Sequence, residues 1–214
     1  MEQGICYIYG AGEYYGPTPR LERIDLIIAA DGGYEHVMAT GMKPDLVVGD
    51  MDSFPGTPED IKNIVVLPQI KDETDMQASI RTGWGAGYRQ FYIYGGTGGR
   101  LDHTLANIQS IADIARRGGR GWLSGSDTLI TAIHKSSISF PPDSEGIVSV
   151  FAHDDTVSGV TETGLKYTLS NASLSNTKPT GVSNEFTGQR SEIKVTGGTL
   201  LVIYPKTVKA EYPS

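Results

Sequence analysis

The chain has very little cysteine: among its 214 residues only Cys6 carries a thiol, so no intramolecular disulfide can form. A single cysteine also excludes a metal site built from several thiolates. Cys6 lies within the apolar run GICYIYG, which favours a buried structural thiol over a reactive one. We therefore expect the protein to work in a reducing compartment, the cytoplasm.

Positive charge and long hydrophobic runs are also scarce. The formal net charge is -7 and the sequence pI is about 5.1, which argues against nonspecific binding of nucleic acid through a basic surface. No apolar run approaches the roughly eighteen residues of a membrane span, and the first residues show neither the basic start nor the apolar core of a signal peptide. We expect no nucleic-acid partner and no membrane partner, whereas an acidic protein is compatible with bound cations.

Short apolar runs of the buried-strand type alternate with helix-like segments through residues 1–125. The helix-like segments lie near residues 33–41, 57–63, 74–84 and 101–117. Strands that alternate with helices in this way indicate a mostly parallel sheet with helices packed on it. We therefore predict an α/β domain over residues 1–125.

The most regular helical pattern is RLDHTLANIQSIADIARRG. Arg116 and Arg117 fall in its last turn, and Gly118 and Gly119 follow where a helix is expected to stop. Apolar residues recur along this segment at helical spacing, at Leu101, Leu105, Ile108, Ile111 and Ala115.

Beyond Ser126 the helical period disappears and β-branched and polar residues alternate. The alternating runs are TLITAIH, GIVSVFAH, GLKYTLSNASLS, EFTGQRSEIKVT and TLLVIYP, with turn signals such as the glycine pair at 197 and PTG at 179 between them. This pattern is typical of an antiparallel sandwich or a barrel-like domain. We predict a fold that combines α/β with all-β, in which an N-terminal mostly parallel α/β sandwich is followed by a C-terminal antiparallel β-sandwich over residues 126–214.

The stretch KDETDMQASI, residues 71–80, has two interpretations. Thr74, followed three residues later by Gln77, fits a capping box, and Asp75 in the first helical turn would favour the positive end of the helix dipole. On that interpretation the acids only cap and solvate a helix. It leaves Asp72 and Glu73 unexplained, so a functional role for the acids stays open.

Acidic residues recur where the predicted parallel strands end, and in open parallel sheets the ligand crevice lies at those carboxyl ends. A turn or cap explains any one of them equally well, but together and without basic partners nearby they would repel each other unless a cation sat among them. Mg²⁺ takes oxygen ligands of this sort and shares them with substrate phosphates. The residues are Asp31 after LIIAA, Asp50 and Asp52 after DLVVG, Asp72 and Asp75 after IVVLP, and Asp102 after FYIYGGTGGR.

The glycine-rich segment GGTGGR, residues 95–100, joins a predicted strand to a predicted helix. Its backbone N–H groups and the helix N-terminus could hold an anion, with Arg100 adding a charge-assisted contact. It is no P-loop, because the Gly-Lys-Ser/Thr ending is missing. Beside an acidic cluster, however, it is typical of phosphoryl-transfer sites. We expect Thr97, Gly98, Gly99 and Arg100 to contact phosphate.

Two other residues carry weaker signals. His103 could act as a general base, but a histidine that begins a helix and orients its neighbour is the favoured interpretation. Tyr167 could stack on an aromatic ligand, although an ordinary strand tyrosine is the simpler interpretation.

Several long stretches also resemble the thiamin pyrophosphokinase family. They are ADGGYEHVMATGMKPDLVVGDMDS (30–53), KDETDMQASI (71–80), GGTGGRLDHTLANIQS (95–110), GLKYTL (164–169) and GVSNEF (181–186). They recur in the family's order and span nearly the whole chain, which makes them far more specific than any short motif. Many relatives have an Asn-Gly pair near the N-terminus, which this chain replaces with Gly10-Ala11-Gly12.

The resemblance implies an enzyme that transfers diphosphate from ATP to the hydroxyl of thiamin and releases AMP. It implies an α/β domain that binds ATP and Mg²⁺, a β-sandwich that binds thiamin and dimerises, and a homodimer with active sites at the subunit interface. The Mg²⁺ ligands would be Asp50, Asp52, Asp75 and Asp102, of which Asp50, Asp75 and Asp102 would also be catalytic. The phosphates would lie near Asp31, Asp52, Asp72, Thr74, Thr97, Gly98, Gly99 and Arg100, and the thiamin pocket would include Ser183 and Asn184.

Alternatives stay open at this point. Either Asp75 or Asp102 could accept the proton of the thiamin hydroxyl. A related diphosphokinase acting on a pterin alcohol would use the same acidic edge with a different acceptor pocket. A sensor that binds thiamin or a nucleotide without turnover is the other alternative, although such crowding of like charges would then serve no purpose.

Overall fold

The structure is a computed structural model, and it describes residues 4–16, 19–49, 64–66 and 72–213. By packing, the chain divides into two compact units. The first comprises Met1–Ser110 and Leu123–Ser126, and the second comprises Ile111–Trp122 and Asp127–Ser214. The helix α3 (Leu101–Arg116) and the strand β6 (Arg120–Ser124) each contribute residues to both units.

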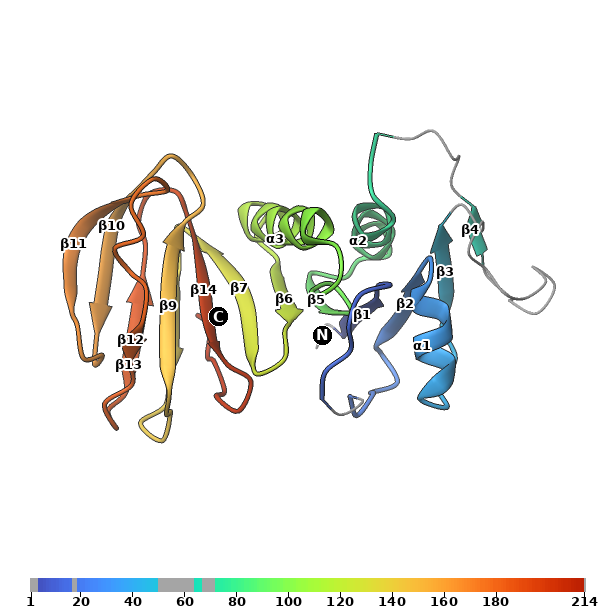
Figure 1. The fold of residues 1–214 in the computed structure, drawn as a ribbon, viewed down its shortest axis with the longest axis horizontal. Coiled ribbons are helices and arrows are strands. Elements are labelled where there is room, and N and C mark those ends of the chain that lie inside the picture. Colours follow the sequence, from blue (N-terminus) through green and yellow to red (C-terminus); the bar gives the residue numbers. More distant parts are fainter. Residues whose placement is uncertain (1–3, 17–18, 50–63, 67–71, 214) are drawn as a thin grey trace. The chain divides into compact units, whose positions relative to one another are not determined.

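The first unit is built on a parallel sheet with the strand order β5-β1-β2-β3-β4 (Figure 1). Each of these strands falls in an apolar run that predicted it, because strands covered on both faces need apolar residues at successive positions. The parallel α/β prediction is confirmed. The strands are β1 (Ile5–Tyr9), β2 (Leu26–Ala30), β3 (Leu46–Gly49), β4 (Ile64–Val66) and β5 (Gln90–Tyr94).

Helices α1 (Gly33–Ala39) and α2 (Asp75–Gly85) lie on opposite sides of this sheet (Figure 1). Successive residues of a strand face opposite ways, so Tyr7 and Tyr9 of β1 join a buried cluster with Val37 of α1, while Cys6 faces α2. On the α2 side the contact is close: a Cβ at Gly83 would lie 2.8 Å from the Cys6 sulfur. A glycine is therefore required there for the helix to reach the sheet.

One predicted helix is not tested by the structure, and another forms but is only partly covered. The segment predicted near 57–63 lies outside the described residues. Helix α3 forms as predicted, and its second half buries Ile111 completely. The apolar residues of its first half are not buried as expected, since Leu101 and Leu105 are 71% and 55% exposed. The apolar stripe of α3 is thus continuous in sequence but covered only along part of its length in a single chain.

The second unit contains two antiparallel layers: the consecutive sheet strands β12-β9-β14-β7, and a separate four-stranded sheet with the order β11-β10-β13-β8. Phe140 of one sheet packs edge-on against Tyr204 of the other, with ring centroids 5.2 Å apart, so the inner faces form a sandwich core. The predicted β-sandwich is confirmed. The strands are β7 (Thr128–His134), β8 (Ser137–Phe140), β9 (Ile147–Ala152), β10 (Thr156–Thr163), β11 (Leu169–Ser175), β12 (Asn184–Glu185), β13 (Ser191–Lys194) and β14 (Thr199–Pro205).

Strands β8 and β10 were not among the predicted runs. Strand β8 has only four residues, and β10 contains Gly159 at φ +67° and shifts its register against β11 twice. These irregularities interrupt the alternation that reveals a strand in sequence. Tyr167 also corrects a prediction: it lies before β11, outside any strand, and is 61% exposed.

Among the residues that the structure describes, no helix has the length and apolar character needed to cross a membrane.

Candidate active site

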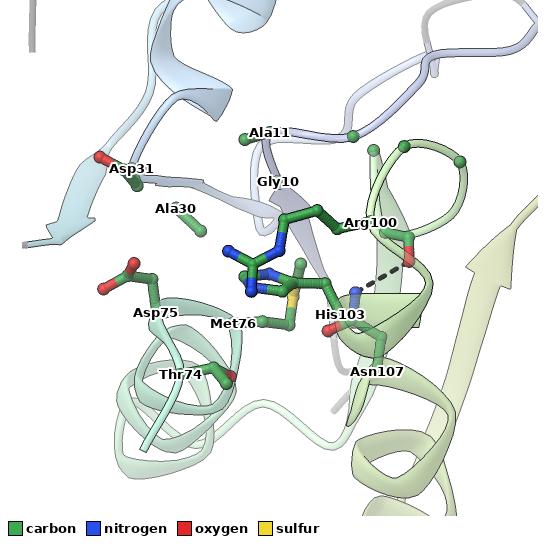
Figure 2. Close-up of a pocket in the computed structure, with 15 residues that line it drawn as sticks. Gly10, Ala11, Ala30, Asp31, Thr74, Asp75, Met76, Arg100, His103 and Asn107 are labelled. Atoms are coloured by element: carbon green, nitrogen blue, oxygen red, sulfur yellow. Dashed lines mark hydrogen bonds between the residues drawn. The ribbon is translucent and has the colours of Figure 1, made fainter. Parts of the chain in front are cut away.

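A pocket of about 390 Å³ lies where the parallel strands of the first unit end. Its wall consists of the loops that follow β1, β2 and β5 together with the first turns of α2 and α3. Side chains of Asp31, Asp75, Arg100 and His103 border it from different elements (Figure 2). The crevice expected at the carboxyl edge of an open parallel sheet is therefore present.

Two glycine-rich loops interlock to form one side of this pocket. The Gly10 N–H donates to the Tyr94 carbonyl at 2.9 Å, and the Gly12 N–H donates to the Gly95 carbonyl at 2.8 Å. A Cβ at Gly12 would lie 2.5 Å from that same Gly95 oxygen, so no larger residue fits without movement. In the segment Gly10-Ala11-Gly12, the close approach of the two loops therefore requires a glycine at position 12.

The loop ahead of α3 forms the part of the pocket best suited to an anion. Gly98 and Gly99 line the pocket with φ of +79° and +58°, a conformation that glycine adopts without strain. They lead directly into α3, a helix of 16 residues, whose N-terminus carries a partial positive charge. Positive-φ glycines and a helix N-terminus are features that favour the binding of an anion.

Asp31 occupies a conformation that few residues other than glycine adopt. Its φ is +45°, and it is held there because its N–H donates to the Val48 carbonyl at 2.8 Å while its own carbonyl accepts from the Tyr34 N–H at 3.2 Å. Strained backbone of this kind persists where the surroundings over-determine it, often at ligand sites. The conformation places Asp31 at the pocket.

The capping box predicted at the start of α2 is confirmed. Thr74 Oγ1 accepts from the Gln77 N–H at 3.2 Å, and Gln77 Oε1 accepts from the Thr74 N–H at 3.1 Å. Glu73, unexplained by the sequence, pairs with Arg81 at 2.7 Å. The cap fixes where α2 begins, which sets Asp75 in the first turn and at the pocket. Capping and a functional acid are therefore compatible in one segment.

At the start of α3, Arg100 and Asp102 form a bidentate pair. Arg100 Nη2 and Nε donate to the two carboxylate oxygens of Asp102 at 2.6 and 3.2 Å. Because of the Arg100 hydrogen bond, with a smaller contribution from the His103 N–H, the pKa of Asp102 falls to about 2. Asp102 thus has a basic partner, contrary to the expectation of acids without one.

The two halves of the chain match two models of one family. Residues 19–120 match "Thiamin pyrophosphokinase, catalytic domain", and residues 135–200 match "Thiamin pyrophosphokinase, vitamin B1 binding domain". The chain belongs to the thiamin pyrophosphokinase family. The pocket described above lies mostly within the catalytic-domain match.

Individual relatives agree with this assignment. The chain is 25% identical over 186 residues to the thiamine pyrophosphokinase of Bacillus subtilis, covering 83% of this chain and 86% of that protein. It is likewise 25% identical over 195 residues to thiamin pyrophosphokinase 1 of Caenorhabditis elegans, covering 82% and 77%. The crystal structure of the B. subtilis thiamine pyrophosphokinase has the same fold, with a TM-score of 0.81 at 23% identity over 94% of this chain and 98% of that one.

The pocket brings together six of the residues that the sequence analysis assigned to thiamin pyrophosphokinase chemistry, and they are Asp31, Thr74, Asp75, Gly98, Gly99 and Arg100. Asp72, Thr97 and Asp102 do not line it. Thr97 instead donates its hydroxyl to the Ser124 carbonyl at 3.0 Å. Asp50 and Asp52 lie outside the described residues, and within the described ones no three acidic, histidine or cysteine side chains gather closely enough to hold a metal ion.

Several pocket residues were missed. Asn107 is buried and donates to the Gly96 carbonyl at 2.8 Å, which ties α3 to the glycine-rich loop (Figure 2). Its signal in the sequence is an amide one turn before Ile111, on the inward face of an amphipathic helix. Met76 and His103 also line the pocket, and His103 had been discounted. No sequence pattern distinguishes Met76 from a core residue.

In the second unit, Ser183 and Asn184 behave differently. Ser183 is exposed, has φ of +61°, and donates its N–H to the Ser149 hydroxyl at 3.0 Å. Asn184 is only 5% exposed, and its amide is fully engaged in hydrogen bonds within the protein. A ligand could reach Ser183 directly, whereas Asn184 has no hydrogen-bonding capacity left to offer.

Proposed function

We propose that this protein is a thiamin pyrophosphokinase in activity as well as in family, transferring diphosphate from ATP to the hydroxyl of thiamin. The observation that carries the proposal is that the family's catalytic and vitamin B1 binding matches occur in order on one chain, and that the catalytic match contains most of a pocket with the chemistry of phosphate binding. A glycine-rich backbone, a helix N-terminus, an arginine and two aspartates border that pocket.

In this proposal the ATP phosphates lie against Gly98, Gly99 and the N-terminus of α3, with Arg100 offsetting part of their charge. Asp31 and Asp75 border the same pocket, and two carboxylates beside phosphate are a donor set that suits Mg²⁺. Asp75 would hold the ion together with Asp50 and Asp52, and the ion would supply charge neutralisation on the phosphate oxygens. Asp102, turned to Arg100, would act mainly by orienting that guanidinium.

Attack of the thiamin hydroxyl on the β-phosphorus, in line with the departing AMP, asks little covalent chemistry of the protein. Positioning and charge neutralisation would supply most of the acceleration. Of the two candidate proton acceptors, Asp102 is a weak base, because Arg100 holds its pKa near 2. Asp75, which lines the pocket, is the better candidate.

The second unit would bind thiamin, in keeping with the vitamin B1 binding match over residues 135–200. Ser183 is the residue we assign to direct contact. Pairing into a homodimer is a further part of the proposal, and the exposed leucines of α3, Leu101 and Leu105, support it, since a second copy would cover them. A cytoplasmic location is also part of the proposal, and it rests on the one free cysteine, Cys6.

An isotope experiment tests the reaction. ATP labelled at both the β and the γ phosphorus should pass both labels together to thiamin, with AMP released in equal amount and only when Mg²⁺ is present. Formation of ADP would contradict diphosphate transfer. Hydroxymethylpterin, supplied in a parallel reaction, should not replace thiamin; faster turnover with the pterin would favour the related diphosphokinase instead.

A further inference from the structure

An acidic side chain lies in the core of the second unit. Glu162, on β10, is 2% exposed, and it pairs across the sheet with Ile193 of β13, which is completely buried. Cross-strand partners share a face, so Glu162 lies on the inner, apolar face of its sheet. Carboxyl groups are rarely placed there unless hydrogen bonds satisfy them.

Glu162 is satisfied on one side only. Its Oε2 accepts from the Asn184 amide nitrogen at 2.7 Å, while Oε1 has no hydrogen-bond partner among the described residues. Burial raises the pKa of Glu162, and the Asn184 hydrogen bond opposes that rise. An apolar residue would suit the core at this position better. The hydrogen bond that Glu162 accepts from Asn184 is therefore the reason we see for a carboxylate at this position.

The Asn184 side chain joins two segments of backbone. Its nitrogen donates to the Tyr167 carbonyl at 2.7 Å, and its oxygen accepts from the Tyr167 N–H and the Glu185 N–H, both at 2.9 Å. A carboxylate can only accept, so Glu162 reinforces the orientation of the Asn184 amide that the backbone groups of Tyr167 and Glu185 also require. In that orientation Asn184 binds both the N–H and the carbonyl of Tyr167.

The two segments carry the exposed apolar surface of this region. The Lys166 N–H donates to the Glu185 carbonyl at 3.0 Å, so the segment containing Tyr167 is paired with the one that follows Ser183. Tyr167 and Val182 are 61% and 43% exposed. Ser183, which has a left-handed conformation, follows Val182 and precedes Asn184, the residue that binds the backbone of Tyr167. Exposed aromatic surface next to strained backbone is typical of a ligand site.

We infer that Glu162 is a positioning residue for thiamin: through Asn184 it holds Tyr167 and Ser183 in the arrangement that receives the ligand. The inference rests on the proposed function, and specifically on the vitamin B1 binding match over residues 135–200, which contains all of these residues. Glu162 does not touch thiamin in this account. Its effect is on thiamin affinity and not on the chemistry of phosphate transfer.

Two replacements of Glu162 separate positioning from folding. Glu162→Gln keeps an oxygen acceptor for Asn184 and should leave the KM for thiamin within about twofold of wild type. Glu162→Met keeps the length of the side chain without an acceptor, and should raise both the KM and the calorimetric Kd for thiamin about five- to tenfold. The KM for ATP and kcat at saturating thiamin should stay within about twofold in both.

A readout without ligand accompanies these assays. The amide protons of Tyr167 and Glu185, both donated to Asn184, should exchange faster in Glu162→Met than in wild type, and at the wild-type rate in Glu162→Gln. Glu192→Met is the matched control, because Glu192 lies on the neighbouring strand and is only half-buried. It should change neither the exchange nor the thiamin affinity.

The possible failures can be told apart. A folded Glu162→Met protein with wild-type thiamin affinity overturns the inference while leaving the proposed function intact. Wild-type protein that binds thiamin but forms no AMP contradicts the proposed function alone, and wild-type protein that binds no thiamin contradicts both. If Glu162→Met does not fold, Glu162→Leu offers a second apolar replacement; failure of both to fold would assign the carboxylate to stability and also overturn the inference.

Discussion

At the scale of single residues, the acids of this chain have different surroundings although they resemble one another in sequence. Asp75 borders the pocket, Asp102 is held by Arg100, and Glu162 is buried with one partner. Their effects on activity and stability should therefore differ. Two predictions concern these residues.

Replacing Asp75 by Asn should lower turnover by at least about two orders of magnitude, which corresponds to a loss of a few kcal/mol of transition-state stabilisation. The fold should persist, because Thr74 and Gln77, not Asp75, form the cap of α2. Turnover is measured as AMP release at saturating Mg²⁺ and thiamin. Asp113→Asn is the control, since Asp113 is exposed and pairs only loosely with Arg117 at 3.5 Å. Near-normal turnover of Asp75→Asn would remove Asp75 from the site.

Glu162 should make the stability of the protein depend on pH. Burial raises its pKa above the value of about 4.3 expected for an unfolded chain. Between the two pKa values the folded state binds more protons than the unfolded state, so the free energy of unfolding should fall as pH rises. Its contribution is most favourable below the unfolded pKa and is lost as pH rises through the folded one. Glu162→Gln should remove this dependence.

The measurement is urea unfolding of wild type and Glu162→Gln at pH 5 and pH 8. The stability of wild type relative to the variant should be lower at pH 8 than at pH 5. Glu192→Gln should leave the wild-type dependence unchanged, because Glu192 is not enclosed in the core. Parallel curves for wild type and Glu162→Gln would show that Glu162 titrates in the folded protein as it does in the unfolded one.

At the scale of elements, helix starts determine where the pocket residues lie. Both α2 and α3 begin at the pocket, and each is preceded by a local device, a capping box in one case and a glycine-rich loop in the other. Local signals of this kind are readable in sequence because they act over three or four residues. The start of α2 can be tested directly.

Thr74→Ala should lower the free energy of unfolding by about 1 kcal/mol, the usual cost of losing an N-cap hydroxyl. Thr74→Ser should retain most of that stability, because its hydroxyl can still accept from the Gln77 N–H. Thermal or urea unfolding of the two variants provides the comparison. If Ala and Ser are equally stable, the hydrogen bond seen at Thr74 does not contribute to the folded state in solution.

At the scale of the whole molecule, the proposed activity needs residues from both family matches, and the proposed homodimer offers a test of how they combine. Suppose that each site joins the phosphate residues of one subunit to the thiamin residues of its partner. An inactive Asp75→Asn protein and an inactive protein altered to Ala at both Ser183 and Asn184 should then complement each other. A mixed dimer would collect both lesions in one site and leave the other intact.

After subunit exchange, activity should return to about a quarter of wild type, because random pairing makes half of the dimers mixed and each mixed dimer has one good site of two. Exchange is verified by native mass spectrometry before activity is measured, and circular dichroism checks that both variants are folded. Verified exchange without recovery of activity would mean that each site is built within one subunit.

The sequence alone determined the parallel α/β half, the cap of α2, the glycine-rich loop and the family. These features rest on short-range rules: alternating strands and helices, a Thr and Gln three residues apart, and glycines where φ is positive. The apolar runs of the buried parallel strands needed no knowledge of their partners, since both of their faces are covered.

Only the tertiary structure decided which polar groups meet. It turned Asp102 to Arg100 and brought Glu162 to Asn184. The irregular strand β10, which carries Glu162, could not be recognised because its Gly159 and register shifts break the alternation. Which side chains face each other across strands depends on register, and register is set by the packing of the whole core, not by any one segment of sequence.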